Sequence, residues 1–378
     1  MKFKSLNGVY LMNSVYGLAG SFVGIFIPIY FLSRHLSVTD VFLFYLIYSI
    51  GTLVSFFFTN EIVQLIGLRN TALIGYPVLF LYYFLVYTIN KYGIPIYIIA
   101  LVNALRISLY WFPLHIWITN ISNEESMGND VGKFFAFPKA LKIFAPVIAG
   151  FIAVFLGFKD LFIVAGIIYF ISALPLLFLP EFSYKSRLKI NKIIELFKGY
   201  RQYFWADAIE NLREDAEGIV WPVFVYLSFK SILSIGYIGT LGAIGAALFM
   251  FFVGKFSDRA NRQKIMMSGA VIIAILWVIR FFVITRVAFY ATTLSVGFFE
   301  ALILVPLNSV VYKTAKNEGG PQFILFRELA VVVGRTVLYV AAILLAFDVK
   351  YVFILPALAG FYFIHLSRKK IGTKLYAG

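Results

Sequence analysis

Long runs of apolar residues recur along the whole 378-residue chain, and they restrict its possible folds more than any other feature. Hydrophobic residues make up 61% of the chain and charged residues only 13%, whereas soluble domains have roughly 45–50% and 25%. A soluble protein of this size could not hide so much apolar surface from water. We therefore expect an all-α integral membrane protein with the lipid bilayer as its main surroundings. A cytosolic enzyme, a secreted domain and a disordered tail are excluded.

The apolar runs have the length of membrane-spanning helices, since a helix needs about 20 apolar residues to cross a bilayer core ~30 Å thick. We predict twelve spans, at 7–32, 40–62, 71–90, 94–118, 134–157, 161–180, 204–229, 234–254, 265–284, 287–311, 322–346 and 351–367. Most of the 33 Lys and Arg residues fall on the cytoplasmic side when both termini are placed there. We therefore expect a multi-pass protein of the cytoplasmic membrane with both termini in the cytoplasm. The same bias explains the net charge of +15 without a nucleic-acid partner.

The chain resembles itself when it is shifted by 194 residues. Gly24 and Pro28 then align with Gly218 and Pro222, and further glycines match downstream. Chance similarity between apolar helices is one explanation, and a duplication is the other. A duplication predicts two pseudo-symmetric six-helix bundles, residues 1–180 and 204–378, joined by a cytoplasmic amphipathic linker at 181–203. Such parallel repeats are a transporter architecture with the substrate site between the halves.

A polar segment between the eighth and ninth predicted spans reads Gly254-Lys-Phe-Ser-Asp258-Arg259-Ala-Asn261-Arg262-Gln-Lys264. It resembles the loop signature of the major facilitator superfamily (MFS), Gly-x-x-x-Asp-Arg-x-Gly-Arg-[Arg/Lys], with Asn261 at the second Gly. The resemblance implies the MFS fold and a cytoplasmic gate formed by Gly254, Asp258, Arg259, Arg262 and Lys264. An ordinary basic loop is the alternative. The equivalent first-half positions, Asn60, Gln64 and Leu68, do not match the signature.

Two weaker resemblances to the same family lie in the first half. Ala145-Pro146-Val-Ile-Ala149-Gly150 resembles the family's antiporter motif, which implies export, although close packing of small residues between helices explains the pattern equally well. Arg106, in the fourth predicted span, resembles the family's arginine associated with proton coupling.

Charged residues inside membrane spans are costly and mark candidate functional positions. In the seventh span, Asp207, Glu210, Arg213, Glu214 and Glu217 share one side of the helix at ~100° per residue, and Asp215 points elsewhere. We expect this stripe to line a cavity or to lie in water at the cytoplasmic mouth. The candidate substrate or proton path comprises Asn13, Arg106, Glu210, Arg213, Glu214, Glu217, Glu300 and Arg335.

Arg106 and Glu300 occupy equivalent positions in the two predicted halves, with opposite charge. A carboxylate beside an arginine can release and regain a proton as helices rock, and this would couple transport to a proton gradient. A buried, purely structural network of ion pairs is the alternative for Arg106, Glu300 and Arg335.

We therefore expect a secondary active transporter that moves a small solute by alternating access, coupled to protons, with efflux by antiport as one mode. The sequence lacks the phosphate-binding loop motif, so we do not expect direct use of ATP. With no Cys and three widely separated His, we expect no metal, no cofactor and no enzymatic activity. The expected partners are the solute, protons and lipid, with the monomer functional. The alternatives are a membrane-embedded Mg-dependent transferase that uses the acidic stripe, and a non-transporting sensor.

Overall fold

The computed structural model describes residues 2–121, 133–134, 137–138, 141, 143–179, 181, 189–253, 262–318 and 320–368. Within these ranges every regular element is a helix, and one lies at each of the twelve predicted spans. Of the described helices, seven are long and apolar enough to cross a membrane, and three shorter ones are also apolar. The other two predicted spans, near 204–229 and 322–346, carry several charged residues each. Their polarity therefore has to be satisfied inside the protein.

The first half of the described chain contains the helices that precede residue 180. These are α1 (Lys2–Val23), η1 (Gly24–Phe26), α2 (Ile27–Ser33), α3 (Val38–Ile66), α4 (Leu68–Tyr87), α5 (Ile89–Tyr92), α6 (Ile96–Ile121), α8 (Ala145–Phe155) and α9 (Phe158–Leu177). Helix α3 begins with a capping box, in which Ser37 and Asp40 each bond the other's backbone N–H. Gly67, with φ +86°, forms the one-residue turn into α4.

The second half contains the helices after residue 189. These are α10 (Ile190–Asp215), the π-helical turn η2 (Ala216–Val220), α11 (Trp221–Phe229), α12 (Ile232–Val253), α13 (Arg262–Phe282), α14 (Arg286–Asn317), α15 (Pro321–Leu344), η3 (Val349–Phe353) and α16 (Ile354–Arg368). Helix α10 is kinked at Tyr200 (φ −124°, ψ 28°). Its first part covers most of the predicted linker, and the boundaries 1–180, 181–203 and 204–378 stay predictions.

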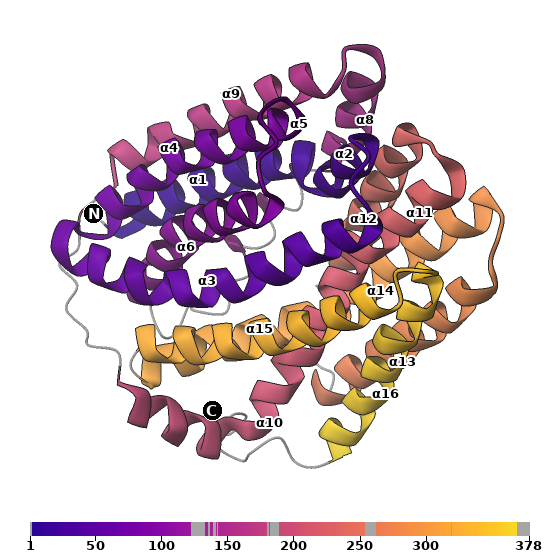
Figure 1. The fold of residues 1–378 in the computed structure, drawn as a ribbon. Coiled ribbons are helices and arrows are strands. Elements are labelled where there is room, and N and C mark those ends of the chain that lie inside the picture. Colours follow the sequence, from indigo (N-terminus) through magenta and orange to yellow (C-terminus); the bar gives the residue numbers. More distant parts are fainter. Residues whose placement is uncertain are drawn as a thin grey trace.

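The helices pack in corresponding pairs within the two halves (Figure 1). Helix α6 contacts α3 and α4, and its counterpart α14 contacts α12 and α13; α1 contacts α9 as α10 contacts α16. The halves meet where α3 lies beside α15 and where α8 lies beside α12. The shift of 194 residues places α3 on α12 and α8 on the end of α15. The repeat therefore relates the α3–α15 contact to the α12–α8 contact, as expected for two halves related by pseudo-symmetry.

Small residues bring α8 and α12 together. A Cβ atom on Gly150 would lie 3.4 Å from Gly236 Cα, and one on Gly236 would lie 2.7 Å from the Pro146 carbonyl oxygen. The backbone N–H of Val147, in the first turn of α8, donates to Thr240 Oγ1 at 3.1 Å. The small residues of 145–150 thus have a packing role between the halves.

Both halves interrupt their first long helix at equivalent places. The helix tightens to a 3₁₀ turn at Gly24–Phe26, before Pro28, and widens to a π turn at Ala216–Val220, before Pro222. Proline removes one backbone donor, which favours such irregular turns. Gly24 and Gly218 are both exposed, and an added Cβ at either would meet nothing within 4 Å.

Candidate functional site

Helix α10 carries the predicted polar stripe into the interior of the second half, where α15 packs against it. Asp207, Glu210 and Arg213 are buried. In this structure the three residues contact other protein groups, and their place in a substrate or proton path stays a prediction. Glu214 is exposed and Glu217 half-buried, so the part of the stripe nearest the π turn is the accessible part.

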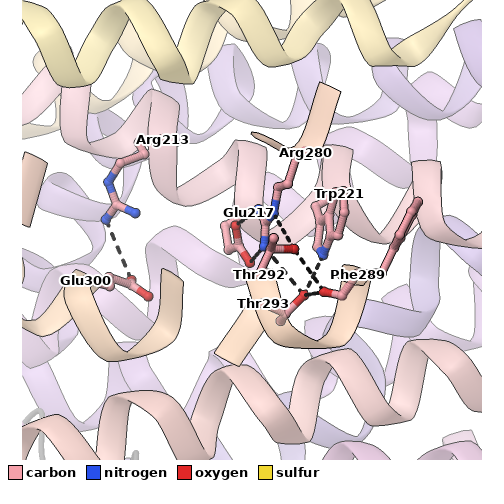
Figure 2. Close-up of polar contacts among 8 residues, drawn as sticks. All are labelled: Arg213, Glu217, Trp221, Arg280, Phe289, Thr292, Thr293 and Glu300. Carbon is pink, nitrogen blue, oxygen red and sulfur yellow. Dashed lines mark hydrogen bonds and ion pairs between the residues drawn. The ribbon is translucent and has the colours of Figure 1, made fainter. Parts of the chain in front are cut away.

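Arg213 connects two carboxylates from different helices. Its Nε donates to Glu210 Oε2 at 3.0 Å and its Nη2 to Glu210 Oε1 at 2.5 Å. Glu300, on α14, lies 3.9 Å from Arg213 Nη2 with 18% of its side chain exposed (Figure 2). Arg213 Nη1 is buried and has no hydrogen-bond partner within the described ranges. Glu210 is thus held tightly and Glu300 loosely, and the three charges sum to −1 when all are ionised.

A second ion pair lies at the contact between the halves. Arg335 Nε is 3.0 Å from Asp215 Oδ2, which also accepts a hydrogen bond from Tyr339 at 2.5 Å. The Tyr339 ring stacks on Tyr45 of α3, with ring centroids 5.6 Å apart. Asp215 was predicted to point away from the other polar residues, but it contacts α15 instead. It therefore joins the charged network of the second half, which its position on the helix did not indicate.

A third group lies about two turns nearer the start of α15. Arg327 Nε is 3.9 Å from Asp207 Oδ2, and its Nη1 donates to Glu328 at 3.5 Å. Arg213, Arg280, Arg327 and Arg335 of the second-half interior thus all contact carboxylates, and α10 supplies three of those six carboxylates.

A further ion pair, with two hydrogen bonds, joins Glu217 to Arg280, and its arginine was not among the residues singled out from the sequence. Arg280 Nη2 donates to Glu217 Oε1 at 2.9 Å, and Nη1 bonds the other carboxylate oxygen (Figure 2). The Arg280 side chain is 0% exposed, with Trp221 and Trp277 rings 3.9 and 4.6 Å from its guanidinium carbon. Thr292 accepts from Arg280 Nε at 3.4 Å. This cluster joins the π turn to α13 and α14.

Arg106 occupies a cage of aromatic rings in the first half. Its Nε donates to Asn103 at 2.8 Å and its Nη1 to the Tyr16 hydroxyl at 3.1 Å. Its guanidinium carbon lies 4.8 Å from the Tyr82 ring centroid and 5.8 Å from that of Tyr83. Within the described part of the chain, no carboxylate forms an ion pair with Arg106. Arg106 and Glu300 therefore do not belong to one network.

The two halves nevertheless use equivalent positions. The repeat relates Arg106 to Glu300 and Tyr16 to Glu210. The first half joins its pair directly, whereas the second half joins its pair through Arg213. Asn13, the remaining predicted path residue, is buried, and its amide donates to the Phe134 carbonyl at 3.0 Å.

The first part of α10 forms a contact that the sequence did not suggest. Tyr200, at the kink of α10, donates to Glu318 Oε1 at 2.6 Å, and Lys192 Nζ lies 3.3 Å from Glu318 Oε2. Burial and the hydrogen bond to Glu318 raise the pKa of Tyr200 to about 12. The linker part of α10 is thus tied to the turn between α14 and α15.

The predicted gate cannot be placed in the same way. Gly254, Asp258 and Arg259 lie outside the described residues, and of Arg262 and Lys264 only the backbone, at the start of α13, is described. In the first half, the equivalent turn at Gly67 is tied instead to Glu181, whose carboxylate accepts the Arg69 N–H at 3.2 Å.

Comparison with known proteins identifies the family. The family model described as Major Facilitator Superfamily matches residues 9–209 and 215–368. The chain belongs to the major facilitator superfamily. The predicted family and the predicted fold, an all-α MFS membrane protein with two pseudo-symmetric six-helix bundles, are thereby confirmed.

Solved MFS structures have the same fold at low sequence identity. The MFS transporter FucP in the outward conformation is 12% identical, with a TM-score of 0.68 over 96% of this chain and 97% of that one. A variant of the E. coli fucose:proton symporter FucP has a TM-score of 0.67 at 12% identity, over 96% and 97% of the two chains. The human organic anion transporter MFSD10 (TETRAN) reaches 0.70 at 12% identity, over 97% and 99%. No curated protein sequence matches the chain.

Proposed function

We propose that this MFS transporter moves a small solute by alternating access and couples the movement to protons. The observation that carries the proposal is the Glu210–Arg213–Glu300 group. Its net charge of −1 lies among apolar helices, where an uncompensated charge is costly. One proton on Glu300 neutralises the group.

Glu300 is the member best suited to exchange that proton. It is partly exposed, and its 3.9 Å separation from Arg213 is an ion pair without a hydrogen bond. Arg213 lies on α10 and Glu300 on α14 of the same half, so the separation changes when these two helices shift against each other within that half during the transport cycle. A shorter separation favours the carboxylate, and a longer one favours the protonated form.

The names of structural neighbours support the same proposal without fixing the solute. One neighbour is a fucose:proton symporter and another an organic anion transporter. Fucose and organic anions therefore belong in the first panel of candidate solutes. Export by antiport is a second mode of transport within the proposal. The proposal also includes the cytoplasmic gate at 254–264, a location in the cytoplasmic membrane with both termini in the cytoplasm, and a functional monomer.

A Mg-dependent transferase has less support from the geometry. Such chemistry needs carboxylates that converge on one ion. Here Glu210, Asp215 and Glu217 face three different arginines. No group of three or more His, Cys, Asp or Glu suited to a metal occurs among the residues that the structure describes. A measurement of solute flux distinguishes a transporter from a sensor that binds solute without moving it.

The experiment uses proteoliposomes that contain a pH-sensitive dye. Fucose and a panel of organic anions are first screened by thermal shift on the purified protein. A solute that binds should then accumulate when a pH gradient is imposed, and the dye should report proton movement with it. Binding without flux would support the sensor instead.

The test of coupling is Glu300→Gln. We expect it to abolish gradient-driven accumulation and to preserve exchange of solute across the membrane. Glu195→Gln is the matched control, because Glu195 lies exposed on the linker part of α10. Unchanged accumulation in Glu300→Gln would refute the role of Glu300.

A further inference from the structure

A groove lies between α4 and α9 in the first half, away from the polar site. Its volume is about 540 Å³, and it is lined by four residues of α4 from Phe80 to Tyr87 and six of α9 from Lys159 to Phe170. Nine of these ten side chains are uncharged, and most are aromatic or aliphatic. Phe80, Phe84, Ile163 and Phe170 are exposed although they lie on membrane-spanning helices. The groove therefore opens toward lipid.

The groove has the length and polarity of one leaflet. Lys159 lies in the first turn of α9 and Phe170 eleven residues further on, a rise of ~16 Å along the helix. Half of a bilayer core is ~15 Å. Lys159 is exposed, and it forms no ion pair or hydrogen bond with the described residues. The groove thus runs from a cation at the membrane interface to the middle of the bilayer.

A missing side chain deepens the groove halfway along. Gly166 faces Phe80, and a Cβ atom there would lie 3.6 Å from the Phe80 ring. The neighbouring positions on this face of α9 carry large apolar side chains, so the glycine leaves a notch between aromatic walls.

The floor of the groove is also the back of the Arg106 cage. The Tyr83 ring lines the groove and lies 5.8 Å from the Arg106 guanidinium carbon. Its hydroxyl bonds that of Tyr169 at 3.4 Å, and the Tyr169 ring lies 4.8 Å from that of Tyr16, which accepts from Arg106. Whatever occupies the groove therefore touches a residue that holds Arg106.

We propose that this groove binds one phospholipid, with an acyl chain lying against α4 and α9 over Gly166 and the phosphate beside Lys159. The apolar walls exclude a polar solute. The single unpaired cation among the described lining residues is complementary to a phosphate, and the leaflet-long path fits a chain rather than a compact ligand. The bound chain packs on Tyr83 and braces the aromatic cage from the membrane side.

The test is photo-crosslinking of the full-length protein in phosphatidylcholine nanodiscs. The probe is phosphatidylglycerol with a diazirine in one acyl chain, and labelled peptides are mapped by mass spectrometry. We expect labels concentrated on 80–87 and 159–170 over the equally exposed face of α3 near Phe57 and Phe58. Gly166→Leu, which fills the notch, should lower groove labelling about tenfold.

A second variant tests the headgroup and stands even if Gly166→Leu fails to fold. Lys159→Gln should lower labelling by phosphatidylglycerol about fivefold, and should leave labelling by a diazirine diacylglycerol, which lacks the phosphate, unchanged. Lys91→Gln, which removes an exposed cation from the same side outside the groove, is the control. Uniform labelling of α3, α4 and α9, or labelling unaffected by both groove variants, would overturn the proposal and leave ordinary surrounding lipid.

Discussion

Replacing Glu217 by Gln should destabilise the protein far more than the same change three residues earlier at Glu214. Glu217 receives two hydrogen bonds from Arg280, whose side chain is 0% exposed. Loss of the carboxylate charge leaves a guanidinium buried without a counter-charge, and breaking such a pair costs ~3–5 kcal/mol. The flanking Trp221 and Trp277 rings contact the guanidinium whether or not Glu217 carries a charge, so they do not change this difference between the two proteins. We therefore expect a loss of about 3 kcal/mol in the free energy of unfolding.

The assay is equilibrium unfolding in mixed detergent micelles, followed by tryptophan fluorescence. Trp221 and Trp277 report directly on the region, because both rings contact Arg280. Glu214 is exposed and forms no ion pair or hydrogen bond with any described residue. Glu214→Gln should therefore change the free energy by no more than ~0.5 kcal/mol.

A double substitution separates the buried charge from the loss of shape. Glu217→Gln combined with Arg280→Met removes both charges, and such replacements are often close to neutral. The double variant should recover most of the stability that Glu217→Gln loses. The reasoning is refuted if Glu217→Gln and Glu214→Gln unfold alike, or if the double variant is as unstable as the sum of its parts.

Three further substitutions test other contacts. Gly236→Leu should force α8 away from α12 and lower the free energy of unfolding by ~1–3 kcal/mol, measured in the same micelles; an unchanged value would mean that the helices are not closely packed. Glu318→Gln should weaken the attachment of the linker and speed amide hydrogen exchange around Tyr200 about fivefold, whereas exchange at wild-type rates would show that the contact adds nothing. Arg106→Lys should lower the thermal midpoint, because an ammonium cannot bond Asn103 and Tyr16 together while covering Tyr82; a wild-type midpoint would refute the importance of the cage.

The number and position of the helices follow from the sequence because a bilayer imposes a simple rule on length and polarity. The repeat is also readable, since Gly24 and Pro28 recur as Gly218 and Pro222 at places where both helices become irregular. The sequence does not reveal that one irregularity is a 3₁₀ turn and the other a π turn. That difference depends on packing around each turn.

The polar site is only partly predictable. The stripe on the seventh span is visible in the sequence, but helical angles alone place Asp215 away from it. In the structure α10 lies inside its bundle, so a residue on another side of the helix also finds an arginine, Arg335. Arg280 gives no local signal, because it lies near the end of a predicted span and its partner Glu217 is 63 residues away.

Equivalent positions in a repeat also mislead about partners. Arg106 and Glu300 carry opposite charges at related sites, but each bonds within its own half. Two residues at equivalent positions face each other only if both side chains point toward the pseudo-two-fold axis between the halves. The packing of the helices, and not the position in the sequence, decides where each side chain points.

The uneven placement of charge in the two halves has an electrical consequence. The predicted spans of the second half hold seven carboxylates and four arginines (Asp207, Glu210, Glu214, Asp215, Glu217, Glu300 and Glu328, with Arg213, Arg280, Arg327 and Arg335), whereas the described spans of the first half hold Arg106 at mid-depth. Moving one elementary charge through the full membrane potential changes its energy by ~2.3 kcal/mol per 100 mV. With these groups ionised, a voltage pulls the two bundles in opposite directions and with unequal force. The resting potential of the cell thus acts on the balance between conformations before any solute binds.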